Sequence, residues 1–227
     1  MKYLAVICFF VFLFLSNCKN RTEDQQATPV TGEDSIEFLD TVLSEKDVAF
    51  LDQLNFSKYA NSKGSRIDWV KFRMVTSMSG DSLQVSHFRP DSLFYQQYGR
   101  SLKYSPDSSM FIDLDSYNIE FLKSHKGRLS PIETGPDTEV SLINLDIREK
   151  TRLAFLGPGN GVEDAGWIDS NTAILIGYHE KDTSKLKKAV IWRYHVPTKT
   201  FHIYESADTS IAGQLLNWRK ERFSKLF

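Results

Sequence analysis

The sequence predicts a mainly β domain of antiparallel sheets, flanked by an N-terminal and a C-terminal helical region. Three observations lead to this prediction. From residue 66 onward apolar and polar residues alternate with a period of two, which is typical of strands buried on one face. A pattern of four short strands occurs twice between residues 102 and 205. Apolar residues spaced three and four apart mark amphipathic helices on either side, at 35–59 and 211–226.

The length and composition fit one folded domain with an appendage. The chain has 227 residues, and we place the domain at 35–227 and its strands at 66–206. It carries 28 basic and 29 acidic residues, so the charge balance predicts no nucleic-acid partner. The cysteines are Cys8 and Cys18. Because Cys8 lies in a segment that we expect to be removed, we predict no disulfide within the mature chain.

The first 17 residues have the features of a secretory signal peptide. Lys2 supplies a positive start, and Tyr3–Leu15 is an unbroken apolar run. A membrane-spanning helix needs about 20 apolar residues to cross about 30 Å of hydrocarbon, so this run is too short to span a bilayer. We therefore predict that residues 1–17 are a cleaved signal peptide.

Leu15-Ser16-Asn17-Cys18 follows the apolar run and resembles the lipobox of bacterial lipoproteins, in the looser form found in Bacteroidota; Asn17 departs from the usual Gly, Ala or Ser. The resemblance implies cleavage before Cys18, acylation of Cys18 and anchoring of the protein to a membrane by its lipid. Lys19, where an aspartate would signal inner-membrane retention, implies the outer membrane of the cell envelope. Residues 18–34 are polar and aperiodic, which predicts a flexible tether.

Residues 35–59 are predicted to be helical. Ile36, Leu39 and Val42 lie on one helical face with Leu43. Ser44 and Asp47 have the spacing of a capping box, so we expect a second helix to begin there.

The strand region begins with two alternating segments, Trp69–Val75 and Leu83–Phe88. Ser79–Ser82 lies between them and is rich in turn-forming residues. This combination predicts a β-hairpin in which the two segments pair with each other.

The internal repeat has two parts. Leu102–Asp113 matches Ala165–Ile176, because each contains an aromatic residue, a polar turn and an apolar strand. Glu139–Thr151 matches Lys188–Thr200, because each contains a strand and a turn that ends in Lys-Thr, before a return strand. Each unit is therefore predicted to form four antiparallel strands.

These units resemble the blades of WD-repeat and TolB-like β-propellers, over residues 100–205. The resemblance implies propeller-blade-like sheets. A closed propeller needs at least four blades of about 40–45 residues. Residues 60–210 hold two units and a hairpin, so we expect an incomplete propeller. We expect a two-sheet or meander arrangement in which helices, including 211–226, cover exposed sheet edges.

Two histidines are the candidate metal ligands. His195 and His202 flank the turn at Pro197–Thr200. If Val196 paired with Phe201, the two imidazoles would lie opposite each other on one face, with Cβ atoms about 5 Å apart. Catalytic zinc sites normally have three protein ligands, and no third ligand can be placed here. We therefore predict no metal or other cofactor.

Aromatic, glycine-rich and acidic segments are further candidate sites. Trp167, Trp192 and Tyr194 are candidates to line a ligand groove, because aromatic side chains often serve binding surfaces. Gly157–Gly161 lacks the lysine and the strand–helix context of a phosphate-binding loop and is predicted to be a turn. The neighbouring carboxylates Glu163 and Asp164 are expected to point to opposite faces of a strand, which excludes paired acid–base catalysis.

The sequence therefore predicts a lipid-anchored cell-envelope protein that binds a protein or other envelope partner without catalysing a reaction. Two alternatives remain open. One is a metal-assisted envelope hydrolase that uses His195 and His202. The other is a subunit that completes a propeller-like ring by forming oligomers.

Overall fold

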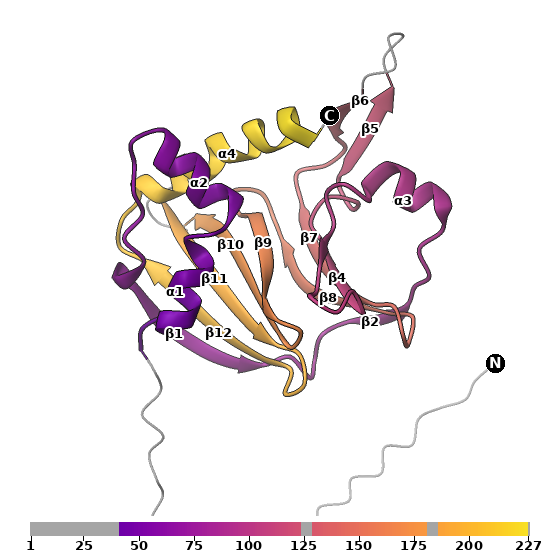
Figure 1. Cartoon of the computed structure of the whole chain (residues 1–227), viewed down its shortest axis with the longest axis horizontal. Helices are drawn as coiled ribbons and strands as arrows, with labels where there is room; N and C mark the ends of the chain where they lie inside the picture. Colours follow the sequence, from indigo (N-terminus) through magenta and orange to yellow (C-terminus); the bar gives the residue numbers. More distant parts are fainter. Residues whose placement is uncertain (1–40, 124–128, 181–185, 227) are drawn as a thin grey trace, which may run out of the picture. The chain divides into compact units, whose positions relative to one another are not determined.

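The computed structural model of the chain describes residues 41–123, 129–180 and 186–226. The predicted signal peptide, Cys18, the tether and the first residues of the predicted N-terminal helical region lie outside the described residues. The described chain is mainly β with antiparallel sheets and flanking helices, as the sequence predicts (Figure 1). None of its helices is long and apolar enough to cross a membrane.

Two five-stranded antiparallel sheets account for most of the strands. In spatial order, the first sheet consists of β1 (Phe72–Ser79), β12 (Thr200–Ser206), β11 (Lys187–His195), β10 (Thr172–Glu180) and β9 (Gly161–Asp169). In spatial order, the second sheet consists of β2 (Val85–His87), β8 (Glu149–Leu156), β7 (Thr138–Asn144), β4 (Met110–Asp113) and β3 (Lys103–Tyr104). A separate hairpin, β5 (Ile119–Lys123) with β6 (Leu129–Glu133), is inserted between β4 and β7.

The two large sheets have the same topology. In each sheet four strands follow one another in chain order, and one earlier strand pairs with the fourth at the outer edge. β9–β12 and the set β3, β4, β7 and β8 are these four-strand units, which confirms the predicted repeat. β3 and β9, the first strands of the two units, contact each other.

The predicted alignment of the repeat is wrong by two residues. The β7–β8 turn ends at Arg148 and the β11–β12 turn ends at Lys199, and both residues have a positive φ, of 56° and 50°. Arg148 is therefore the structural counterpart of Lys199. Aligning the two segments by their Lys-Thr motif pairs Lys150 with Lys199 instead. Backbone conformation at the end of the turn, rather than residue identity, sets the equivalence.

The hairpin predicted between residues 69 and 88 is also wrong. β1 pairs with β12 in the first sheet, and β2 pairs with β8 in the second. The turn between them connects the two sheets: the Gly80 N–H donates to the Lys199 carbonyl, and the Gln84 carbonyl accepts from the Arg152 N–H. A two-stranded hairpin alone is marginal in water, whereas joining two larger sheets pairs each strand with an established edge.

The helices of the described chain are α1 (Glu45–Leu51), α2 (Asn55–Ser62), α3 (Ser92–Tyr98) and α4 (Ser210–Leu226), with a 3₁₀ turn, η1 (Trp69–Lys71). The capping box at Ser44 and the C-terminal helix are confirmed. Val42 is not helical as predicted, because it forms a β-bridge with Arg73. α3 is an unpredicted helix within the strand region, and the Asp91 side chain accepts a hydrogen bond from Phe94 N–H at its start.

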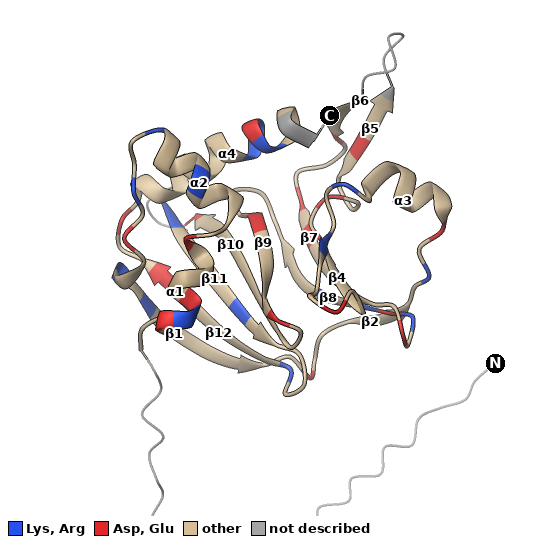
Figure 2. Cartoon of the chain, viewed as in Figure 1, with Lys and Arg blue, Asp and Glu red and all other residues tan. Residues whose placement is uncertain are grey.

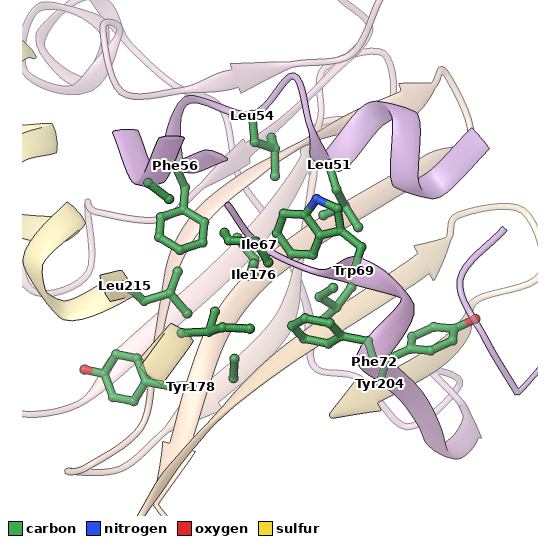
Figure 3. Packing of buried hydrophobic residues seen from close by; sticks show 14 of the residues in the cluster. Leu51, Leu54, Phe56, Ile67, Trp69, Phe72, Ile176, Tyr178, Tyr204 and Leu215 are labelled. Carbon is green, nitrogen blue, oxygen red and sulfur yellow. The ribbon is translucent and has the colours of Figure 1, made fainter. Parts of the chain in front are cut away.

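The inner strand β10 of the first sheet is buried on both faces. On one face Ile174 and Ile176 belong to a core cluster formed with α1, α2, η1 and α4. On the other face Ala173 and Leu175 belong to a cluster shared with the second sheet. Figure 3 shows Phe56 from α2 and Leu215 from α4 pointing toward Ile176 on β10. α4 therefore packs on a sheet face, in contact with β9, β10 and β11, instead of on the predicted edge.

Ser44→Ala is expected to lower the free energy of unfolding by about 1 kcal/mol, because it removes the acceptor for Asp47 N–H at the start of α1. Urea denaturation measures the change. Ser224→Ala is the matched control, since the Ser224 hydroxyl is exposed and donates only to the Glu221 carbonyl within α4. We expect a change below about 0.5 kcal/mol for the control. Equal effects in the two variants would contradict a capping role for Ser44.

Candidate functional site

The two candidate metal ligands do not face each other. In the β11–β12 ladder His195 lies opposite Thr200, and His202 lies opposite Arg193. The turn closes one residue earlier than predicted, at Val196–Lys199, and this changes the partner of every residue in the ladder. The His195 Nδ1 atom lies 2.8 Å from the Thr198 hydroxyl. Burial, with the positive charge of Arg193, lowers the pKa of His202.

No group of three His, Cys, Asp or Glu side chains within the described ranges is arranged to hold a metal ion. The hydrolase alternative depended on His195 and His202 lying opposite each other. The ladder gives each histidine a different partner, so it does not support that alternative.

The three candidate groove aromatics pack in the core cluster between the sheets. Trp167 is 7% exposed and its indole N–H donates to the Lys103 carbonyl at 2.8 Å, which joins β9 to β3. Tyr194 is 2% exposed, and its ring centroid lies 4.5 Å from that of Phe201. Trp192 is partly buried against the same cluster. These positions give the three side chains a packing role.

A pocket of about 420 Å³ lies elsewhere, where α2, α4 and the start of β3 meet. Its volume is within the range of small-molecule sites, about 300–1,000 Å³. The residues that line it are basic, aromatic or neutral and polar: Asn55, Lys58, Tyr59, Ser62, Ser101, Lys103, Trp218 and Arg222. Along the described ribbon as a whole, basic and acidic residues are intermixed (Figure 2). The pocket departs from that pattern because its lining is basic without acidic residues.

Behind the pocket, Asp164 holds Lys103 in place. Asp164 is fully buried on β9, and its Oδ1 atom lies 3.1 Å from the Lys103 ammonium. Its other oxygen accepts the Phe56 N–H at 3.0 Å. Leu54, the N-cap residue of α2, has no side chain able to accept a hydrogen bond, so Asp164 caps this helix from another part of the chain.

Arg222 is held by a second buried carboxylate. Its two terminal nitrogens donate to Asp115 at 2.9 and 2.7 Å, in the two-bond geometry that makes arginine–carboxylate pairs strong. Arg222 is 5% exposed and Asp115 is 1% exposed. The neighbouring Asp113 accepts hydrogen bonds from Asp115 and Ser116, while burial raises its pKa.

Glu163 forms the third buried ion pair. It is fully buried, and Arg219 lies 3.2 Å from its Oε1 atom while also pairing with Glu133 at 3.1 Å. The β9–β10 register shifts at this position, so Glu163 is the extra residue of a β-bulge between Val162 and Asp164. The bulge interrupts the strict alternation that the sequence analysis assumed for Glu163 and Asp164.

Burial raises the pKa of Glu163 to about 7, and the nearby Arg219 and Arg222 only partly oppose this shift. One structural cause is visible. The Oε2 atom of Glu163 is buried and accepts no hydrogen bond from the described residues. A carboxylate with an unsatisfied buried oxygen loses hydration without replacement, which favours its protonated form.

The lining contains two serine hydroxyls, and both have partners in the protein. Its serine hydroxyls donate to backbone carbonyls, Ser62 to Tyr59 and Ser101 to Tyr98. The lining residues include no histidine or carboxylate that would act as a base toward them. Two of its basic groups, Lys103 and Arg222, are held by buried carboxylates, as expected for a preorganised ligand site, whereas Lys58 is exposed.

This pocket was not predicted from the sequence, although α4 carries one signal of it. Leu215, Trp218 and Arg222 are spaced three and four residues apart, so an arginine occupies the apolar stripe of the helix. A charged residue in such a stripe requires a buried partner. The identity of that partner, Asp115, depends on long-range folding.

Comparison with protein-family models, with curated proteins and with solved structures found no match for this chain.

Proposed function

We propose that this chain is a lipid-anchored protein of the bacterial cell envelope that binds a small ligand without transforming it. The observation that carries the proposal is the pocket between α2, α4 and β3, with its basic and aromatic lining and its lack of an acid–base pair. The membrane anchor is supported by the lipobox-like residues 15–18 and the apolar run before them. The polar tether would place the folded domain away from the outer-membrane surface.

We further propose that the two large sheets are propeller-blade-like units of an incomplete propeller. Three features support this. The sheets share one strand order, their first strands β3 and β9 are in contact, and a common apolar cluster lies between their faces. Adjacent blades of a propeller are related in this way.

Cys18→Ser is expected to abolish incorporation of a labelled fatty acid and to release the protein from the membrane fraction, because the acylated thiol is the proposed anchor. The measurement is autoradiography of the immunoprecipitated protein after growth with radioactive palmitate. Cys8→Ser is the matched control and should label normally. Labelling of the Cys18→Ser variant would show that the anchor lies elsewhere.

The binding proposal is tested on full-length protein extracted from its native membrane. Mass spectrometry of small molecules released by denaturation is expected to show a compound at a stoichiometry near one per chain. Lys58→Glu, which reverses an exposed charge in the pocket lining, should deplete that compound. Lys220→Glu is the control, since Lys220 is exposed on α4 and is not part of the lining. A compound retained equally by both variants would contradict binding in this pocket.

A further inference from the structure

We infer that the pocket binds a small organic anion that carries a flat ring, with its carboxylate or phosphate at Lys58 and Lys103 and its ring against Tyr59 and Trp218. This inference rests on the proposed binding function and specifies the chemical class of the ligand. Charge, shape and rigidity of the lining each contribute to it.

The charge of the pocket surface selects an anion. Lys58, Lys103 and Arg222 line the pocket, and the lining includes no acidic residue. The carboxylates that balance Lys103 and Arg222, Asp164 and Asp115, are at most 1% exposed and lie outside the lining. A ligand in the pocket therefore contacts the cationic groups and does not contact their carboxylate partners.

Among the basic residues of the lining, Lys58 has the most hydrogen-bond donors available to a ligand. It is exposed and forms no ion pair with any carboxylate of the described ranges. Lys103 also retains capacity, because its ammonium has three donors and its ion pair with Asp164 uses one carboxylate oxygen. Two ammonium groups at one pocket suit a ligand with two or three acceptor oxygens.

The aromatic wall selects a flat group. The ring centroids of Tyr59 and Trp218 lie 5.5 Å apart with an interplanar angle of 42°. Trp218 is held in the core, at 4% exposure, and belongs to the cluster that contains Leu215 and Phe56. A rigid aromatic surface beside cationic groups favours a ligand whose ring packs on it while its charged end reaches the lysines.

The inference is tested by titrating the full-length protein in detergent micelles with four probes: benzoate, phenyl phosphate, benzamide and acetate. The readout is the indole N–H signal of Trp218 in ¹H–¹⁵N spectra, which is identified by its loss in Trp218→Phe. Benzoate or phenyl phosphate is expected to shift this signal with a Kd at least ten-fold lower than benzamide, which lacks the charge, and acetate, which lacks the ring. The ratio of benzoate to phenyl phosphate distinguishes a carboxylate from a phosphate ligand.

Lys58→Gln is expected to weaken binding of the better anionic probe by three-fold to ten-fold and to leave benzamide binding unchanged. Lys220→Gln, which removes the same charge from α4 outside the lining, should alter neither. Benzamide or acetate binding as tightly as the anionic aromatic probes would overturn the inference, and so would equal effects of the two lysine variants. If no probe binds but a native compound still depends on Lys58, the inference fails while the proposed binding function stands.

Discussion

Replacing Asp115 by asparagine is expected to lower the free energy of unfolding by about 3–5 kcal/mol, because Arg222 stays buried and loses the charged partner that it bonds. Arg222 is 5% exposed, and both of its terminal nitrogens bond the Asp115 carboxylate. Asparagine keeps the size of the side chain, so the decrease in the free energy of unfolding measures the effect of removing the negative charge. Urea denaturation at pH 7 measures it.

Two further variants separate charge from packing. Lys46→Gln breaks an ion pair of the same 2.7 Å length at the surface, where the two side chains are 65% and 43% exposed. It should cost less than about 1 kcal/mol, because water solvates the remaining charge. The double variant Asp115→Asn, Arg222→Met should recover most of the loss, since it removes the buried charge itself. A loss below about 1 kcal/mol for Asp115→Asn would contradict the assignment of a buried, paired Arg222.

Glu163→Gln is expected to raise the free energy of unfolding at pH 8 by about 3 kcal/mol and to change it little at pH 4. The folded-state pKa of Glu163 is about 7, above its ordinary value of 4.5. The folded state therefore binds more protons than the unfolded state between these values, so the contribution of Glu163 to stability falls as pH rises from 4.5 to 7. A shift of this size corresponds to about 3 kcal/mol, and glutamine stays neutral throughout.

The measurement is the free energy of unfolding of the wild type and of Glu163→Gln at intervals from pH 4 to pH 8. Subtracting the two curves removes the contribution of Asp113, another buried carboxyl whose pKa is raised, because Asp113 is present in both proteins. The groups that face Glu163 are Arg219 and Arg222 on α4, Asp115 after β4 and Tyr178 on β10. A variant that is less stable than the wild type at pH 8 would show that the ion pair with Arg219 outweighs burial.

Much of the local structure could be predicted from sequence, because its causes are close together in the chain. The capping box needs Ser44 and Asp47 three residues apart, and both bonds form. Periodicity predicted the C-terminal helix and the strands, and the repeated pattern predicted two units of four strands. Strand pairing was harder to predict from the sequence, because the partners of β1 and β2 lie far along the chain.

The candidate site could not be predicted, because two of its three basic groups, Lys103 and Arg222, depend on distant partners. Lys103 is oriented by Asp164 on β9, and Arg222 by Asp115 beyond β4. Sequence analysis instead favoured His195 and His202, which are close in sequence but are separated by the register of their ladder. The turn lies one residue earlier than predicted, and this difference alone gives both histidines other partners.

Sequence alone therefore determined most of the elements, because their stability depends on neighbours within a few residues. It also determined the apolar N-terminal segment and its lipobox-like end. Only the tertiary structure decided which partner each buried charged side chain has. Asp164 caps α2 from 108 residues away, and the bulge at Glu163 interrupts the alternation that would send the two carboxylates to opposite faces. Such contacts follow from burial: a charged group removed from water must find a partner wherever the fold supplies one.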